Sequence, residues 1–166
     1  MSAVAVRIGQ GVDVHPFSDD PDRDLRICGV LIPGTVGLAG HSDADVGLHA
    51  VADALLGATA LGDLGARFGV DRPETAGADS TDLLRVVVAE VAAEGWQVGN
   101  LDVTIVAQRP RLAGYRDAMR AHLAEACEVE VGAVSVKFTT TDHLGALGRS
   151  EGILATASCL LLSQQR

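Results

Sequence analysis

Asp13 and His15 stand two residues apart in the segment GVDVHPF, where they alternate with Val12 and Val14. Successive side chains of a β-strand point to opposite faces. The carboxylate and the imidazole are therefore expected on one face and the two valines on the other. Such a pair is either the polar face of a surface strand or part of a metal site, and the segment alone leaves both interpretations open.

A second group of such side chains follows in the segment HSDADVGLHAVAD. Asp45, His49 and Asp53 are four residues apart, which on a helix places an imidazole between two carboxylates. A solvated helix face explains that stripe when it is taken alone. Combined with the first segment, however, Asp13, His15 and His49 supply one carboxylate and two imidazoles, a set that binds zinc and leaves a fourth position open. Asp45 or Asp53 is then expected to accept the free N–H of a ligand imidazole.

Two further segments carry side chains suited to phosphate or sugar. LGDLG at 61–65 is either a simple turn or a means of directing Asp63 toward a ribose. KFTTTDHLGALGR at 137–149 combines three threonines, a carboxylate, a glycine-rich turn and an arginine at an expected strand end. These groups could bind phosphates and the magnesium ion that accompanies them. The end of a β-strand alone does not require so many polar groups.

The elements that must position these residues follow from periodicity and turn signals. A helix is expected from about Asp45 to Leu56, with Ser42 or Asp43 as its N-cap and Gly57 as its stop. A second helix is expected over 78–95, capped by Asp79 or Ser80, and a third over 115–127. Strands are expected at 5–15, 96–108, 133–140 and 152–162, and a short strand pair is expected around 25–33. This mixture predicts one α/β (α+β) domain over residues 1–166, a mixed β-sheet with helices covering one side.

Composition limits the partners and the compartment. The net charge of -9 argues against a nucleic acid or an anionic membrane as partner, because both favour a basic surface. Cys28, Cys127 and Cys159 are far apart and form no CxxC motif, which predicts neither a disulfide framework nor a thiolate zinc site. The most apolar tract, ILATASCLLL, is too short to cross a bilayer. We expect a cytoplasmic protein.

The motifs taken together resemble one enzyme family. DVHPF, HSDAD with His49, LGDLG, GADS, NLDVTIVAQ-x-P and KFTTTD followed by GR resemble the 2-C-methyl-D-erythritol 2,4-cyclodiphosphate synthase family, in order from about residue 6 to 162. The resemblance implies a phosphorus–oxygen lyase of the non-mevalonate isoprenoid pathway. Such an enzyme closes 4-diphosphocytidyl-2-C-methyl-D-erythritol 2-phosphate into a cyclic diphosphate and releases CMP. It also implies sheets packed around the threefold axis of a homotrimer, with active sites between adjacent subunits.

The resemblance further implies two metals and their ligands. Asp13, His15 and His49 would bind zinc, and Asp142 would reach a second ion, magnesium or manganese. These four residues and Thr140 would be catalytic. An axial cavity of the trimer would take an isoprenoid diphosphate.

Substrate contacts are implied in the same way. His41 and Ser42 would contact the methylerythritol phosphate end, and Asp63, Leu64 and Gly65 would hold that end or the ribose. The neighbouring subunit would supply a cytosine pocket made of Ala107, Gln108, Arg109, Pro110, Arg111, Leu112 and Ala113. Thr139, Thr140 and Thr141 would line the CDP phosphates, and Arg149 would lie toward the threefold axis.

Several positions depart from the family pattern. Val70 and Arg72 stand where an acidic loop is usual, Asp142 stands for Glu, Arg111 for Lys and Ala146 for Phe.

The metal residues alone also fit a zinc hydrolase, or a binding module that stores or senses zinc without turnover. The segments AQRPRLA and TTTD favour the synthase over a bare metal module, because such a module has no need of a nucleotide side.

Overall fold

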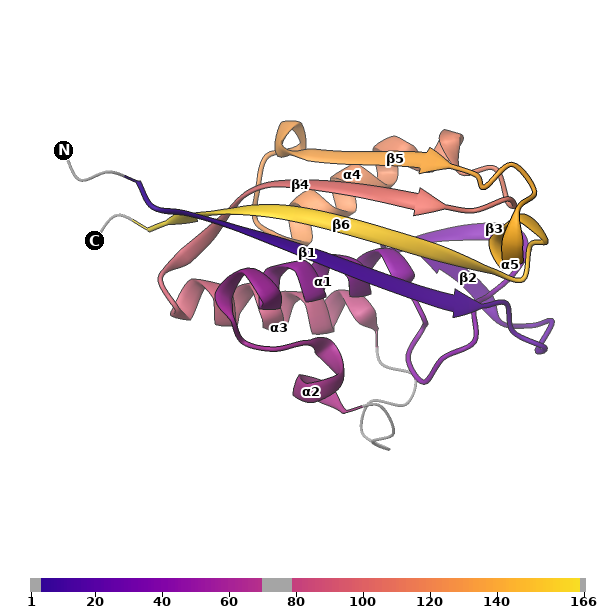
Figure 1. Ribbon diagram of the computed structural model, residues 1–166, viewed down its shortest axis with the longest axis horizontal. Helices are drawn as coiled ribbons and strands as arrows, with labels where there is room; N and C mark the ends of the chain where they lie inside the picture. Colours follow the sequence, from indigo (N-terminus) through magenta and orange to yellow (C-terminus); the bar gives the residue numbers. More distant parts are fainter. Residues whose placement is uncertain (1–3, 70–78, 165–166) are drawn as a thin grey trace.

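A four-stranded sheet in the order β1-β6-β4-β5 forms one layer of the computed structural model, and helices form the other (Figure 1). The structure describes residues 4–69 and 79–164. β1 (Val6–Pro16) and β4 (Trp96–Val106) flank β6 (Gly152–Ser163) and run antiparallel to it. β5 (Val134–Thr139) runs parallel to β4, so the sheet is mixed, as predicted. A separate hairpin of β2 (Asp24–Ile27) and β3 (Val30–Val36) matches the expected strand pair. Val70 and Arg72 lie outside the described residues.

Three main helices cover one face of the sheet (Figure 1). They are α1 (Val46–Thr59), α3 (Ser80–Ala93) and α4 (Arg116–Ala126). α4 lies in the crossover that a parallel β4–β5 pair requires. Two short helices, α2 (Leu64–Phe68) and α5 (Gly145–Gly148), were not expected from the sequence. No helix among the described residues is long and apolar enough to cross a membrane.

Two glycines let β1 lie directly against α1. A Cβ built on Gly9 would lie 1.9 Å from the carbonyl oxygen of Ala54, and one built on Gly11 would lie 2.0 Å from that of Ala50. Any side chain at either position would therefore push the strand away from the helix. Because side chains alternate, Asp13 lies on the same face as both glycines and is directed to the helix side.

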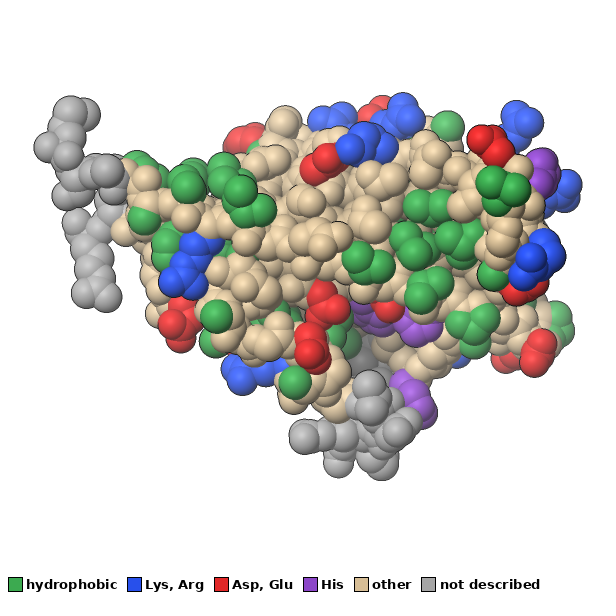
Figure 2. All heavy atoms as spheres, in the orientation of Figure 1, with side chains coloured by type: hydrophobic (Ala, Val, Ile, Leu, Met, Phe, Trp, Pro, Cys, Tyr) green, Lys and Arg blue, Asp and Glu red, His purple; other side chains and the backbone are tan. Residues whose placement is uncertain are grey.

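The other face of the sheet is uncovered and partly apolar. Ile8 is 76% exposed and Val6 58% exposed on β1, although both are large hydrophobic residues. Figure 2 shows hydrophobic side chains gathered toward both ends of this face. A polar row separates the two ends, where the register places Gln10 and Asp102 on either side of Ser158. In the single chain, this face therefore leaves large apolar side chains in contact with solvent.

The cap of α1 differs from the prediction. Asp45, and not Ser42 or Asp43, is the N-cap residue, and its side chain accepts the N–H groups of Gly47 and Leu48. Ser42 and Asp43 instead accept from the N–H groups two residues further on, which shapes the turn before the helix. The helix also continues past Gly57 to Thr59. The cap of α3 is Asp79, as predicted.

We predict that Gly11→Ala lowers the free energy of unfolding by roughly 1–3 kcal/mol, because the added methyl group overpacks the β1–α1 contact. The matched control is Gly57→Ala on α1, where the nearest heavy atom to a built Cβ is 4.0 Å away. This change should stabilise the protein by roughly 0.5–1 kcal/mol, because alanine is the better helix former. Urea unfolding followed by circular dichroism measures both, and a neutral Gly11→Ala would contradict the close-contact argument.

Candidate active site

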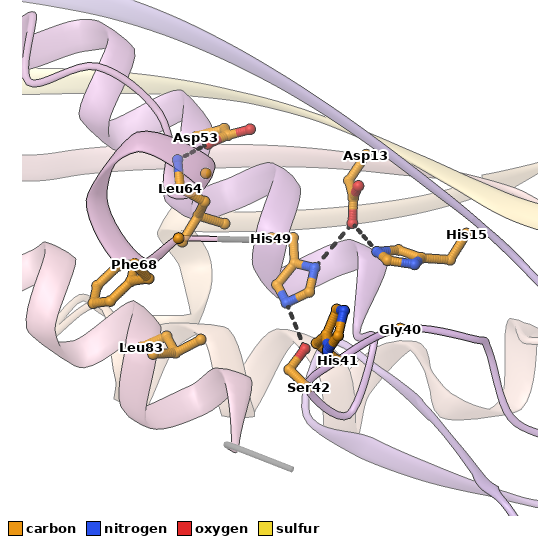
Figure 3. Close-up of a pocket in the computed structure, with 12 residues that line it drawn as sticks. Asp13, His15, Gly40, His41, Ser42, His49, Asp53, Leu64, Phe68 and Leu83 are labelled. Atoms are coloured by element: carbon orange, nitrogen blue, oxygen red, sulfur yellow. Dashed lines mark hydrogen bonds and ion pairs between the residues drawn. The ribbon is translucent and has the colours of Figure 1, made fainter. Parts of the chain in front are cut away.

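Asp13, His15 and His49 converge from β1 and α1 (Figure 3). The carboxylate oxygen Oδ2 of Asp13 lies 3.2 Å from Nε2 of His15 and 3.0 Å from Nδ1 of His49. One ligand atom from each residue lies within 4.8 Å of the others. The three residues that the sequence predicts as a metal site are therefore together in space.

In both imidazole rings, the nitrogen that faces away from Asp13 forms hydrogen bonds that fix the orientation of the ring. Nδ1 of His15 lies 2.6 Å from the carbonyl oxygen of Ala39, which can only accept, so this nitrogen carries the proton. Nε2 of His49 lies 2.8 Å from the hydroxyl of Ser80 and 3.3 Å from that of Ser42. The other nitrogens, Nε2 of His15 and Nδ1 of His49, are directed at Asp13, where each can hold a proton or bind a metal ion.

Charge is concentrated where these atoms meet. Burial opposes ionisation of Asp13, yet hydrogen bonds and charge interactions with His15 and His49 hold the pKa of its carboxyl well below the usual range. The hydrogen bond with Asp13 likewise raises the pKa of His15, against the effect of burial. An ionised carboxylate with two imidazole nitrogens aimed at it attracts a positive charge, which is a pair of protons or a metal ion.

The donor set fits a divalent metal. One carboxylate oxygen and two imidazole nitrogens are ligands that zinc accepts, and three protein ligands leave a position for substrate. The Ala39 carbonyl serves His15 as the partner of its second nitrogen, an arrangement usual for metal-bound histidines. Asp13, His15 and His49 thus form a group that could hold a metal ion, which we call the metal-type group.

These residues form one wall of an open cavity of about 460 Å³, which we call the Asp–His–His pocket. His41, Ser42, Leu64 and Gly65, to which the family resemblance assigns substrate contacts, also line this pocket. The remaining lining residues are Gly40, Asp53, Phe68, Gly69 and Leu83. Figure 3 shows Asp13, His15, His41, Ser42 and His49 at one end of the pocket, and Leu64, Phe68 and Leu83 with Asp53 at the other. This division suits a ligand that is part sugar or nucleoside and part anion.

The hydrogen bonds of the Asp45 carboxylate in the described part of the chain go to backbone N–H groups and not to an imidazole, contrary to the prediction. Its carboxylate is fully buried and accepts the N–H groups of Cys28, Gly29, Gly47 and Leu48 at 2.6–3.0 Å. Burial raises the pKa of this carboxyl, and the backbone hydrogen bonds oppose that effect. Asp45 joins the β2–β3 turn to the start of α1, so its role is structural.

Asp53 and Asp63 are placed differently from the prediction as well. Asp53 lines the pocket, but its Oδ1 accepts the N–H of Leu64 at 2.8 Å and no hydrogen bond to His49 is found in the described part of the chain. Burial raises the pKa of Asp53, and the charges of Asp63 and Asp13 add to this effect. Asp63 caps α2 through the N–H of Ala66 at 2.7 Å and is not among the residues that line the pocket.

Three residues that the sequence did not assign to the site support it. Nη2 of Arg23 donates to the carbonyl oxygens of Gly40 and Ser42, on either side of His41, at 3.0 and 2.5 Å. Ser80 reaches His49, and the hydroxyl of Ser80 donates in turn to Asp43. The GADS motif contained a signal for Ser80, but its serine was predicted only as a helix cap.

A second cavity, of about 330 Å³, lies where the parallel strands β4 and β5 end, and we call it the strand-end pocket. Carboxyl ends of parallel strands are common ligand sites. Its lining includes most of the predicted cytosine segment and two of the three threonines. The complete lining is Ile105, Ala107, Gln108, Pro110, Arg111, Leu112, Ala113, Phe138, Thr139 and Thr140. It shares no lining residue with the Asp–His–His pocket.

Thr141, Asp142, Arg149 and Arg109, the remaining predicted residues, do not line this second pocket. The Thr141 hydroxyl donates to the carbonyl oxygen of Leu144, and the Thr140 hydroxyl donates to Asp142 at 3.3 Å. Asp142 is exposed and has a positive φ of 51°, so the loop turns sharply here. Arg149 is exposed and pairs with Glu151 at 2.6 Å. Arg109 is exposed beside the pocket.

Fold and site together define a single-domain α/β protein with a metal-type Asp/His/His group and a separate pocket at the ends of two parallel strands. The model of the YgbB family matches residues 6–162, and the chain belongs to that family.

Individual relatives agree over nearly the whole length. The 2-C-methyl-D-erythritol 2,4-cyclodiphosphate synthase of Trichlorobacter lovleyi is 53% identical over 159 residues, which cover 96% of this chain and 100% of that protein. The family resemblance predicted from the motifs is thus confirmed.

Solved structures share the fold. IspF of Plasmodium falciparum in complex with CDP superposes with a TM-score of 0.85 at 29% identity, covering 99% of this chain and 100% of that one. The bifunctional IspDF of Campylobacter jejuni gives a TM-score of 0.92 at 35% identity. That match covers 97% of this chain and 43% of the bifunctional protein.

The position of Asp45 leads to a test of its role. We predict that Asp45→Asn lowers the free energy of unfolding by roughly 1–3 kcal/mol, because the amide cannot accept from all the buried N–H groups that the carboxylate serves. Metal affinity of the folded variant should stay within twofold of wild type, since the side chain of Asp45 hydrogen-bonds to backbone N–H groups and not to the side chains of the three ligand residues. Thermal unfolding and chelator competition measure the two quantities. Weakened metal binding with unchanged stability would restore the role predicted from the sequence.

Proposed function

We propose that the chain is a 2-C-methyl-D-erythritol 2,4-cyclodiphosphate synthase, which cyclises 4-diphosphocytidyl-2-C-methyl-D-erythritol 2-phosphate and releases CMP. The observation that carries the proposal is the Asp13, His15 and His49 group at a pocket wall, in a chain that matches the YgbB family from residue 6 to 162. The relatives with this name and the CDP-bound structural neighbour support the same activity.

The metal we propose for the Asp–His–His pocket is zinc, with magnesium or manganese bound near Asp142. Such cations, when bound, supply positive charge to the phosphate oxygens and help to align them. The carboxylate of Asp13 and the two imidazoles would hold the first ion. Asp142 would reach the second directly or through water, since its side chain is shorter than the usual Glu.

The remaining residues bind and orient the substrate. His41 and Ser42 would hold the methylerythritol phosphate end, and Leu64 and Gly65 would hold that end or the ribose. At the strand-end pocket, the segment 107–113 would receive cytosine, with backbone groups reading the base edge. Thr139, Thr140 and Thr141 would donate hydrogen bonds to the diphosphate. The 2-phosphate oxygen then attacks the β-phosphorus while CMP leaves, and alignment of two anions is the main barrier that these contacts lower.

Active sites shared between subunits would explain why the two pockets are separate in one chain. The uncovered sheet face, with Val6, Ile8, Val12 and Val14 each 48–76% exposed, supports burial against other copies. We therefore propose a homotrimer with the sheets facing its axis. Each complete site would combine the Asp–His–His pocket of one subunit with the strand-end pocket of the next. An isoprenoid diphosphate in the axial cavity, and Arg149 near that axis, belong to the same proposal.

The reaction is tested by phosphorus NMR of the products. With the CDP-linked substrate, zinc and magnesium, the wild-type protein should give the cyclic diphosphate and CMP. His49→Ala should lose stoichiometric zinc and nearly all cyclisation, because it removes one of three ligands. His122→Ala, a histidine outside the group, is the matched control and should retain both. A linear phosphate product would identify a hydrolase, and bound zinc without any product would identify a binding module.

Shared sites are tested by mixing two inactive variants. His49→Ala spoils only the Asp–His–His pocket, and the double change Thr140→Ala with Asp142→Ala spoils only the strand-end side. Unfolding and refolding equal amounts together should give mixed trimers, in which one interface combines two intact faces, so roughly a quarter of all sites regain activity. Native mass spectrometry confirms mixing. If mixed trimers stay inactive, each site is built within one chain.

A further inference from the structure

We propose that Asp43 and Ser80 form a relay that fixes the protonation pattern of the His49 ring, which makes Ser80 a positioning residue for a metal ligand. The inference deepens the proposed function, since it concerns the same metal centre. It rests on the hydrogen bonds of residues that belong to three different parts of the chain: the turn before α1, α1 itself and the first turn of α3.

The relay runs from a carboxylate to a hydroxyl to an imidazole. Asp43 accepts both the backbone N–H of Ser80, at 3.2 Å, and its hydroxyl, in a short hydrogen bond. The Ser80 oxygen lies 2.8 Å from Nε2 of His49. Ser80 is only 1% exposed, so water does not compete freely for this hydroxyl.

The direction of each hydrogen bond follows from what the groups can donate. An ionised carboxylate only accepts, so the single proton of the Ser80 hydroxyl points to Asp43. The Ser80 oxygen then has only lone pairs for His49, and Nε2 of that ring must be the donor. Nδ1 of the same ring lies 3.0 Å from Asp13, on the side where the metal ion is expected. With a metal ion bound at Nδ1, the ring therefore keeps its one proton on Nε2, where Ser80 accepts it.

The opposite protonation pattern would block the metal site. A proton on Nδ1 of His49 would occupy the space between the ring and Asp13, where the metal ion is expected. Ser42 is a weaker partner for Nε2, because its hydroxyl is 3.3 Å away and already accepts the N–H of Ala44. Ser80 and Asp43 therefore determine which His49 nitrogen is available, although neither lies within the Asp–His–His group.

The chain supplies a matched control one residue away. Thr81, also in the first turn of α3 and 6% exposed, places its hydroxyl 3.1 Å from Nε2 of His122. This is the same pairing of a buried hydroxyl with an imidazole, but His122 is not part of the metal-type group. A change at Thr81 disturbs the same helix end without altering the relay.

The first measurement needs no variant. In zinc-loaded protein, long-range proton–nitrogen NMR shows which nitrogen of each histidine carries a proton. His49 should carry its proton on Nε2. A predominant Nδ1 proton would overturn the proposal. Because substrate is absent, the result is independent of whether the protein makes a cyclic diphosphate.

The second measurement uses Ser80→Ala, Asp43→Asn and the control Thr81→Val, with zinc affinity determined by chelator competition. Ser80→Ala should weaken zinc binding by roughly 10- to 100-fold. Asp43→Asn should also move the His49 proton toward Nδ1, because the amide can donate to Ser80 and free its hydroxyl proton to face Nε2. Thr81→Val should leave affinity and protonation unchanged. Wild-type zinc affinity in the first two variants, or an equal loss in all three, would refute the relay.

Discussion

The contact between β1 and α1 is the constraint on which the site depends. Asp13 lies on the strand and His49 on the helix, and their side chains are short, so the two backbones must be close for the ligand atoms to meet. Gly9 and Gly11 make this distance available because the carbonyl oxygens of Ala54 and Ala50 occupy the space that their Cβ atoms would need. The small residues of α1 serve the same purpose from the other side. The metal-type group is thus a product of core packing as much as of the ligands themselves.

Much of this arrangement is predictable because it is periodic. Alternation along residues 5–15 places Asp13 and His15 on one face, and the apolar residues of 25–33 indicate a short strand pair. The motif order along the chain indicates the family and, with it, His49 as the third ligand. These inferences hold because they depend on local geometry, or on segments that keep their order and spacing.

The incorrect assignments concern residues whose partners are set by tertiary structure. Asp45 shares a helical spacing with His49, but it precedes the first turn, where its carboxylate serves backbone N–H groups of the helix and of the β2–β3 turn. Asp53 has the correct spacing too, yet the start of α2, which the sequence did not predict, engages its oxygen. Ser80 is 31 residues from His49 and 37 from Asp43, so no periodic pattern connects them.

The separation between Asp13 and His49 along the chain has a thermodynamic consequence. A cation bound to both side chains would join residues 36 positions apart and so close a loop that contains the β2–β3 hairpin and the loop at Gly40. Such a clip restricts the unfolded chain and favours the folded one, by an amount that rises with the free metal concentration. The ion would then act as a reversible cross-link between the first strand and the first helix. The metal supply of the cell would set both the activity of this chain and its resistance to unfolding.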